Sequence, residues 1–357
     1  MHSFELYTPA MVAGDIAIVF RGHGDMHPIV LTPGEVFNNK SGSFKHDDFI
    51  GKPWGSKFAG HQSKGHVTIL HPTPELWTRS LPHRTQILYQ ADIAVITMKL
   101  RLRPGMVVVE SGTGSGSFSH SLIRTVAPTG HVHTFEYHPV RANAAREEFI
   151  QHGLDHLVTQ YHRDVCTDGF PDSVKGIADA VFLDLPAPWT AVASAGSTLR
   201  RDQAARICCF SPCIEQVSRT CDALRDYGFT GIEMVECLMR EHDVRAVVRV
   251  SADDARRQVK PRKGKDAVER RRAGRPVTGD RRGPAGAPPS VVAAAAAAAA
   301  SNNEDEEDIA AVATTGLAED VSLRFRGFAR GHTSFLTFAT LLPLDDVETA
   351  AAMETDE

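Results

Sequence analysis

The chain has 357 residues, a length that fits one large domain with additions or two domains. Its formal net charge is -5 at pH 7, but the charges are gathered in blocks, so the net charge indicates no class of partner. Its six cysteines contain no C-x-x-C pair and its 17 histidines no H-E-x-x-H spacing, which favours reduced thiols inside a cell and predicts no metal site. The first ten residues lack the basic start and apolar core of a signal peptide, and outside an alanine tract no apolar run approaches the roughly 18 residues of a membrane span.

Short apolar runs alternate with Gly, Asn and Ser over residues 11–70. The runs at 15–20, 27–31, 34–37 and 66–70 have the length of strands, and the sequence NNKSG that begins at Asn38 is typical of a hairpin turn. We therefore predict a small β-rich domain over residues 1–72.

From about residue 73 the pattern changes to alternating helices and strands. Residues 88–100 have helical spacing, with Ile93, Ile96 and Leu100 on one face. The alternation predicts an α/β domain over residues 73–250, with a mainly parallel sheet covered by helices on both faces. The predicted strands are 107–111, 131–137, 158–161, 180–184, 204–210 and 230–236, and the predicted helices are 117–126, 140–152 and 214–227.

The most informative segment is VVVESGTGSG, which is followed twenty residues later by Glu136 at the end of HVHTFE. This pattern indicates a strand that turns tightly into a helix. It consists of a β-branched run, then Glu110, then Gly112, Gly114 and Gly116. Glycines without a Cβ let a ligand lie against the backbone, and Glu136 is placed to accept hydrogen bonds from ribose hydroxyls. The pattern therefore predicts an adenosine-containing ligand.

The spacing of these glycines distinguishes two classes of cofactor. A nicotinamide dinucleotide fingerprint is G-x-G-x-x-G/A, whereas here the spacing is G-x-G-x-G, and Ser117 stands where the last glycine of that fingerprint would be. E-x-G-x-G-x-G instead resembles the cofactor loop of class I S-adenosylmethionine methyltransferases. A nicotinamide oxidoreductase and an ordinary glycine-rich turn remain alternatives, and a binding assay with S-adenosylmethionine against NAD separates the two cofactors.

A second candidate segment is AVFLDLPAPW, in which an apolar strand ends at Asp184. Because ligands bind beyond the carboxyl ends of parallel strands, Asp184 should project into the same crevice as the glycine loop. A carboxylate there can accept a hydrogen bond from an exocyclic amine and stabilise positive charge on a ring. Pro186 and Pro188 stiffen this segment, and Trp189 could stack on a base, although an aromatic residue after a strand is more often part of the core. The segment differs from the [DNS]-P-P-[YFW] motif of methyltransferases that act on exocyclic amines.

Residues 251–320 have no pattern that could form a core. Twelve Lys or Arg residues and three acidic ones occur between Arg256 and Arg282, followed by GPAGAPP, eight alanines and an acidic run at 304–308. We predict a disordered insertion, then C-terminal strands over 321–345 that complete the catalytic domain, and an acidic tail over 346–357. The basic half could direct nuclear import or contact a nucleic-acid backbone, and a solvated linker without a role is the alternative.

Five motifs in order resemble those of the catalytic subunits of eukaryotic tRNA (adenine-58-N1)-methyltransferases and their bacterial and archaeal relatives. The resemblance covers about residues 1–250 and 322–342, and the order of five motifs is more specific than any one of them. The departure is the long insertion over 251–320. The motifs are HRTQILY from His83, ESGTGSGS from Glu110, DLPAPW from Asp184, FSPCIEQV from Phe210 and GHTSFL from Gly331.

The resemblance implies the class I methyltransferase fold, which is Rossmann-like with a mainly parallel seven-stranded sheet, together with a small N-terminal β-rich domain. It implies S-adenosylmethionine as the cofactor, with Glu136 on the ribose and Asp164 beside the adenine ring. It also implies that Asp184 is catalytic and that Tyr89 lies near the pocket for the target base. The implied cofactor-binding residues are Leu88, Glu110, Gly112, Gly114, Ser115, Gly116, Ser117, Glu136, Arg141, Asp164, Val165 and Asp184.

The implied activity is methyl transfer to N1 of adenine 58 in the T-loop of tRNA. We expect the target adenine to leave its stack and its N1 to attack the sulfonium methyl group in line, without a cysteine nucleophile. Asp184 near N6 would stabilise the cationic ring or take the proton. Two alternatives are a class I methyltransferase that acts on another substrate and a non-catalytic RNA-binding paralogue, which would be expected to lose the glycine loop or the aspartate.

The resemblance also implies partners and a location. These are tRNA, a related non-catalytic subunit in a two-plus-two heterotetramer, and the nucleus, the last supported by the basic groups at 260–265 and 270–272. No membrane contact is expected. The sequence leaves open whether the chain is active alone, whether messenger or mitochondrial RNA is also methylated, and what the insertion and His332 do.

Overall fold

The computed structural model describes residues 4, 7–22, 24–61, 65–82, 84–238, 242–248, 319–325 and 334–344. The contacts divide the chain into two units, of which the second is Arg240–Ala329. In that unit β13 (His242–Val248) and β14 (Glu319–Phe325) form an antiparallel pair of their own. This differs from the expectation that the C-terminal strands all complete the catalytic domain, because β14 pairs with β13 in a separate two-stranded sheet, whereas β15 (Phe335–Leu341) joins the main sheet. The predicted disorder over 251–318 and the acidic tail lie outside the described residues.

The N-terminal part is β-rich, as predicted. Its four-stranded antiparallel sheet has the order β2-β1-β6-β5, and β3 and β4 form a separate hairpin. Asn39 pairs with Gly42, and the Asn39 side chain accepts a hydrogen bond from the Ser41 amide, which confirms the predicted turn. The elements are β1 (Ile16–Gly22), β2 (Asp25–Val30), β3 (Val36–Asn39), β4 (Gly42–Lys45), α1 (His46–Phe49), β5 (Lys57–Ala59) and β6 (His66–Leu70).

A short helix, α2 (Pro74–Ser80), leads from this sheet into the α/β domain. Thr73 caps it by accepting a hydrogen bond from the Leu76 amide, and Pro74 stands at its first position, where a missing N–H is harmless. Trp77 of α2 and Leu81 pack with Ile18 of β1 in a small buried cluster. The helix is therefore anchored on the N-terminal sheet.

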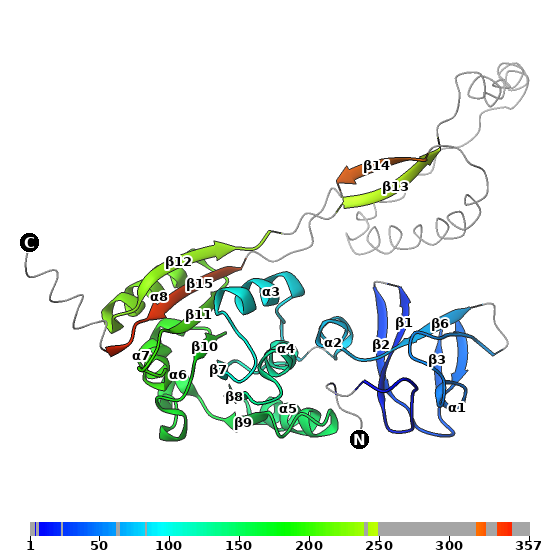
Figure 1. The fold of residues 1–357 in the computed structure, drawn as a ribbon, viewed down its shortest axis with the longest axis horizontal. Helices are drawn as coiled ribbons and strands as arrows, with labels where there is room; N and C mark the ends of the chain where they lie inside the picture. Colours follow the sequence, from blue (N-terminus) through cyan, green and yellow to red (C-terminus); the bar gives the residue numbers. More distant parts are fainter. Residues whose placement is uncertain are drawn as a thin grey trace, which may run out of the picture. The chain divides into compact units, whose positions relative to one another are not determined.

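The α/β domain is built on a seven-stranded sheet with the order β12-β15-β11-β10-β7-β8-β9 (Figure 1). The strands β7 to β11 run parallel, and β15 runs antiparallel to both of its neighbours. The chain fills one half from β7 to β9 and resumes at β10 in the other half, so the topological switch point lies between β7 and β10. The strands are β7 (Val107–Ser111), β8 (His131–Glu136), β9 (Val158–His162), β10 (Ala180–Leu183), β11 (Ala205–Ser211), β12 (Thr230–Glu236) and β15 (Phe335–Leu341).

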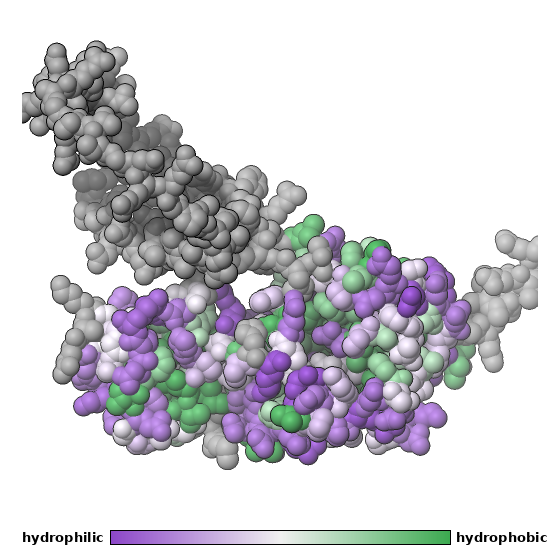
Figure 2. Space-filling model, turned by 180° about the vertical axis from the view of Figure 1, so that it is seen from behind, coloured by the Kyte–Doolittle hydropathy of each residue, from purple (hydrophilic) through white to green (hydrophobic). Residues whose placement is uncertain are grey.

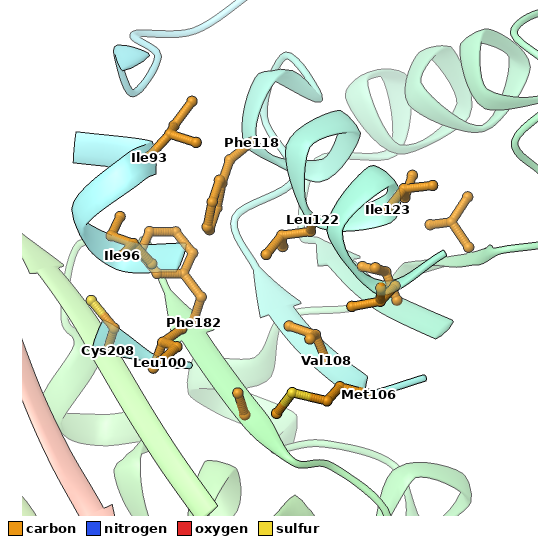
Figure 3. Packing of buried hydrophobic residues seen from close by; sticks show 14 of the residues in the cluster. Ile93, Ile96, Leu100, Met106, Val108, Phe118, Leu122, Ile123, Phe182 and Cys208 are labelled. Carbon is orange, nitrogen blue, oxygen red and sulfur yellow. The ribbon is translucent and has the colours of Figure 1, made fainter. Parts of the chain in front are cut away.

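Helices cover both faces of this sheet, and each face has its own core. Strand β10 is buried on both sides: Ala180 and Phe182 belong to one core, and Val181 and Leu183 to the other. Figure 3 shows the first core, in which Phe118 meets Phe182 edge to face at 4.7 Å between ring centres. The helices are α3 (Gln90–Lys99), α4 (Ser117–Val126), α5 (Pro139–Gln151), α6 (Val165–Asp168), α7 (Pro188–Thr198) and α8 (Ile214–Tyr227), with a 3-10 turn at Asp172–Val174.

On the face seen in Figure 2, hydrophilic side chains predominate and apolar ones form scattered patches. The most exposed large apolar side chains, such as Tyr7, Val140 and Leu238, come from different elements. Among the described residues, no helix has the length and apolar character that a membrane crossing requires.

Candidate active site

The glycine loop, residues 112–116, and Asp184 meet at the carboxyl ends of β7 and β10, at the switch point of the sheet. The Asp184 amide donates a hydrogen bond of 2.8 Å to the carbonyl of Ser111. Gly112 has a φ of +98°, and a Cβ on it would lie 2.3 Å from the Asp184 carbonyl oxygen. Any other residue at this position would push the two segments apart, so the glycine is required by the packing of the crevice as well as by the turn.

Glu136, at the end of β8, is buried and held from three sides. One carboxylate oxygen accepts from the Gly114 amide at 3.0 Å. The other accepts from the His138 amide at 3.0 Å and from the Arg141 guanidinium at 2.6 Å. The Arg141 guanidinium also lies over the ring of Tyr137, 5.1 Å from its centre, and the hydrogen bond that it donates to Glu136 raises its pKa. The carboxylate is thus fixed beside the glycine loop, with Arg141 as its partner.

Glu110, in contrast, lies beneath the loop and is only 1% exposed. Its carboxylate accepts from the hydroxyls of Ser119 at 2.6 Å and Thr134 at 2.7 Å, and the Thr134 hydroxyl also bonds that of Thr113. Burial raises the pKa of Glu110 to about 7, and the hydroxyl bonds only partly oppose this. Glu110, which was predicted to bind the cofactor, therefore connects α4 and β8 through hydrogen bonds, and Thr134 extends this connection to the loop.

Asp184 lies beside Gly112, and no described residue donates a hydrogen bond to its carboxylate. Desolvation by burial raises its pKa from 3.8 to about 6, with a smaller contribution from the charge of Glu136. A carboxylate that is partly desolvated and has no partner is poised to accept a proton or a hydrogen bond from a ligand. The nearby carboxylates of Glu110 and Glu136 both have protein partners.

The segment that follows Asp184 is held by the start of α8. Gln216 donates from its side-chain amide to the Pro186 carbonyl at 2.9 Å, and its side-chain oxygen accepts from the Cys213 amide at 3.1 Å. These bonds join the DLPAPW and FSPCIEQV motifs, which are far apart in the sequence. The guanidinium of Arg219 covers the ring of Trp189 at 5.2 Å, so one face of this ring is already occupied.

The residues before and in α3 differ in exposure. Leu88 is 5% exposed and packs in the core, whereas Tyr89, directly before α3, is 49% exposed. Asp92 accepts a hydrogen bond of 3.2 Å from the Ser334 hydroxyl, which brings the end of the GHTSFL motif to α3. His332 lies outside the described residues.

Asp164 and Val165, predicted beside the adenine ring, lie at the start of α6. Asp164 is exposed and caps this helix: its two oxygens accept from the Cys166 amide and the Thr167 hydroxyl, both at 3.0 Å. Val165 is buried in the second core. An exposed carboxylate at the end of β9 keeps lone pairs for a ligand, because each oxygen uses only one of them here.

Ser115 of the loop and Ser117 at the start of α4 both use their hydroxyls to bond the segment before α3 and helix α2. The Ser115 hydroxyl accepts from the amides of Arg84 and Thr85, and the Ser117 hydroxyl bonds that of Thr78 at 2.9 Å. Their side chains hold the loop, so a ligand would meet their backbone. The sequence interpretation missed Arg84 and its partner Glu148; the only signal was the HRT sequence at the start of its motif.

Comparison with known families gives two matches. Residues 65–341 match the family described as "tRNA methyltransferase complex GCD14 subunit", and residues 10–57 match that described as "TrmI-like N-terminal". The first match covers most of the α/β domain, and the second covers the N-terminal sheet in part.

Three fungal relatives are described as catalytic subunits of tRNA (adenine(58)-N(1))-methyltransferase. The Cryptococcus neoformans protein is 52% identical over 233 residues, which are 65% of this chain and 53% of the relative, so the chain spans about half of that protein's length. The Candida albicans protein is 46% identical over 71% of this chain and 76% of its own. The Schizosaccharomyces pombe protein is 44% identical over 71% of this chain and 70% of its own.

Two solved structures resemble the whole chain. A SAM-dependent O-methyltransferase from Thermotoga maritima has a TM-score of 0.65 at 21% identity, over 96% of this chain and 98% of that one. The tRNA methyltransferase TrmI from Aquifex aeolicus has a TM-score of 0.59 at 21% identity, over 93% of this chain and 98% of that one. At this identity the likeness concerns the fold, which is that of class I S-adenosylmethionine-dependent methyltransferases, as predicted.

Proposed function

Because this chain belongs to the family of GCD14 subunits of tRNA methyltransferase complexes, we propose that it is a catalytic subunit that methylates N1 of adenine 58 in tRNA, with S-adenosylmethionine as methyl donor. The observation that supports catalysis best is Asp184. It lies beside the glycine loop at the switch point, its pKa is raised to about 6, and no described residue donates a hydrogen bond to its carboxylate. A non-catalytic relative would have no need for such a group.

The residues around the loop fit S-adenosylmethionine. Glu136 offers a buried carboxylate to a ribose. Among the described residues its Oε2 accepts from the Gly114 amide alone and so retains a lone pair, whereas its Oε1 is occupied by His138 and Arg141. No side chain caps the first turn of α4, so the amides of this ten-residue helix can meet the carboxylate of an amino acid. When bound, S-adenosylmethionine supplies a methyl group already activated for transfer by its sulfonium.

The chemical task left to the protein is to orient the acceptor and to stabilise charge. The adenine ring becomes cationic when N1 is methylated, so a negative group near N6 lowers the barrier. Asp184 is mostly ionised near pH 7, and its raised pKa makes it a better proton acceptor than an exposed aspartate. Tyr89, exposed before α3, offers an aromatic face on which an extruded base can stack.

Three finer proposals follow, two from the names of the relatives and one from the sequence. The relatives are described as catalytic subunits and the family as part of a complex, which supports a further subunit. We propose that this partner is a related non-catalytic subunit in a two-plus-two assembly. The substrate in those names supports tRNA rather than another RNA. We also propose a nuclear location, on the basis of the Lys- and Arg-rich groups at 260–265 and 270–272.

The test is methyl transfer from labelled S-adenosylmethionine to unmodified tRNA, with and without the partner subunit, followed by mapping of the methylated base. We expect 1-methyladenosine at position 58, formed only with the partner. Activity without the partner would replace the assembly proposal by a homo-oligomer. Cofactor binding without tRNA methylation in either mixture would contradict the substrate assignment.

A further inference from the structure

The glycine loop is held from behind by a set of side chains that the proposed reaction does not use. We propose that Arg84, with Thr78, Thr85, Glu148 and His120, forms a clamp that fixes the loop in its ligand-binding conformation, and that Arg84 is the positioning residue that sets the affinity for the methyl donor. We call these five residues the loop clamp. The inference rests on the proposed function, since it assumes that the loop binds S-adenosylmethionine.

The first part of the clamp acts on the middle of the loop. The Ser115 hydroxyl oxygen accepts from the amides of Arg84 and Thr85, both at 3.0 Å, and the hydroxyls of Ser115 and Thr85 lie 3.1 Å apart. Because the Ser115 oxygen has two lone pairs and both are used, its own proton is directed to Thr85. The Thr85 hydroxyl lies 2.8 Å from the place where a Cβ on Gly114 would stand, so the close contact requires a glycine there.

The second part is the Arg84 side chain, which joins the loop to α5. One guanidinium nitrogen donates to the Ser115 carbonyl at 3.1 Å, and another donates to the Glu148 carboxylate at 2.9 Å. The two side chains are only 22% and 11% exposed. Burial raises the pKa of Glu148, and the charge of Arg84 opposes this. Charge-assisted bonds in such a place are stronger than neutral ones, so this bridge is the strongest element of the clamp.

The third part holds the end of the loop. His120 is bonded through Nδ1 to the Gly116 carbonyl at 2.6 Å and through Nε2 to Nδ1 of His152 at 2.7 Å. A carbonyl can only accept, so His120 donates from Nδ1 and accepts from His152. Burial lowers the pKa of both imidazoles, which keeps them neutral. The rings of Phe4 and Trp77 cover His152 at 4.6 Å and exclude water from this side.

His120, Glu148 and His152 each offer a possible metal-ligand atom, and these atoms lie within 4.8 Å of one another, a spacing that a metal ion could bridge. The partners described above favour a different role. Both ring nitrogens of His120 are engaged, and the Glu148 carboxylate faces the Arg84 guanidinium, whose positive charge repels a cation. The geometry is that of a hydrogen-bonded clamp.

A clamp matters here because the loop is rich in glycine. Gly112, Gly114 and Gly116 all have positive φ values, between +54° and +98°, and glycine loses more conformational freedom on ordering than any other residue. If the loop were ordered only by the ligand, this entropy would be subtracted from the binding free energy. The clamp orders it in advance, and binding is tighter as a result.

The experiment compares R84Q with R124Q in the full chain. Arg124 of α4 pairs with Glu75 of α2 at 2.6 Å, so R124Q removes a matched ion pair that does not touch the loop. The Kd for S-adenosylmethionine is measured by calorimetry, and amide hydrogen exchange of residues 112–120 is measured without ligand. We expect R84Q to raise the Kd about tenfold or more and to speed exchange of the loop, while R124Q changes the Kd less than about twofold.

Each result decides between the possibilities. If R84Q binds the donor with a Kd within twofold of that of the unmodified protein, and exchange of the loop is unchanged, the proposed role of the loop clamp is wrong. A lower melting temperature as the sole effect of R84Q would mean that Arg84 has a purely structural role. If the unmodified protein does not bind the donor, the proposed function fails, while loop exchange still tests the clamp. In turnover, R84Q should raise KM for the donor more than it lowers kcat, and R84K should recover part of the loss.

Two milder variants serve if R84Q does not fold. E148Q keeps the shape of the side chain but removes the charge that faces Arg84, and Thr78→Val removes the bond to Ser117. Both should raise the Kd about threefold and speed exchange of the loop. No change in either variant would contradict the proposal.

Discussion

The two sides of the glycine loop differ in how their polar groups are satisfied. On the clamp side, Glu110, Glu148 and Ser115 all have protein partners within 3.1 Å. On the crevice side, the Asp184 carboxylate has no hydrogen-bond donor among the described residues, although burial raises its pKa as it does that of Glu110. Burial without a partner is costly, so it persists where a ligand supplies the partner. The acid that we propose for the reaction therefore differs from the acids that hold the loop in lacking a protein partner among the described residues.

The largest expected effect is on the crevice side. Asp184→Asn keeps the shape of the side chain but removes its charge, so the cationic ring loses its stabilising partner. We expect the rate of methyl transfer to fall about 10³-fold, with the Kd for S-adenosylmethionine changed only a few-fold. Single-turnover rates with tRNA and calorimetry with the donor measure the two effects. A rate within tenfold of the unmodified protein would remove Asp184 from the mechanism.

The same acid predicts the pH dependence of the rate. Since the ionised form is the active one and the pKa of Asp184 is about 6, the rate should rise as the pH increases through about 6 and then level off. The D184N variant should not show this rise of the rate with pH. A rate that is constant between pH 5 and 8 would contradict the role of an ionised Asp184.

Glu136 tests the ligand-binding part of the crevice. Glu136→Gln weakens acceptance from a ribose and leaves Arg141 without its ion pair, so the Kd for the donor should rise roughly tenfold to hundredfold. Glu147→Gln on the exposed face of α5 is the matched control and should change the Kd less than about twofold. Equal affinities of the two variants would show that Glu136 does not contact the donor.

Glu110 tests the supporting side of the loop, because its carboxylate bonds the hydroxyls of Ser119 and Thr134 beneath the loop. Its pKa is raised from 4.5 to about 7, so the folded state favours the protonated acid. The corresponding stability is fully present below about pH 4.5 and is lost as the pH rises through about 7. E110Q is neutral throughout, so between pH 5 and 8 it should lose less stability than the unmodified protein, by on the order of 3 kcal/mol. The free energy of unfolding of both proteins is measured by chemical denaturation at pH 5 and pH 8. An equal change in this free energy for E110Q and the unmodified protein would contradict the prediction.

Much of the fold follows from the sequence because the periodic signals are strong. The strand VVVES, the helix Ser117–Val126 and the helix Ile214–Tyr227 occur within the predicted limits. The helix α7 was not predicted, since its run of Ala, Ser, Thr and Gly gives little contrast between faces; it forms because Ala191, Val192 and Ala195 pack on the sheet. Local pattern identifies an element only when its two faces differ.

The site was predictable where chemistry and topology coincide, and less so elsewhere. The places of Asp184 and Glu136 follow from strand ends in a parallel sheet. The bond from Arg84 to Glu148 joins residues 64 positions apart, and nothing local marks either of them. Likewise, the inward direction of Ser115 depends on the segment that packs behind the loop. Such contacts are set by tertiary packing, so a single sequence cannot show them.

The smallest expected effect concerns how Asp184 is supported. Gln216 holds the segment after it through the Pro186 carbonyl and also caps α8 at Cys213. Gln216→Leu removes both bonds without touching the glycine loop, so the segment should move more and kcat should fall about three- to tenfold. The Kd for the donor should stay the same, because the clamp side is intact. A change in Kd larger than the change in kcat would mean that the two sides of the loop are not independent but form a single coupled network.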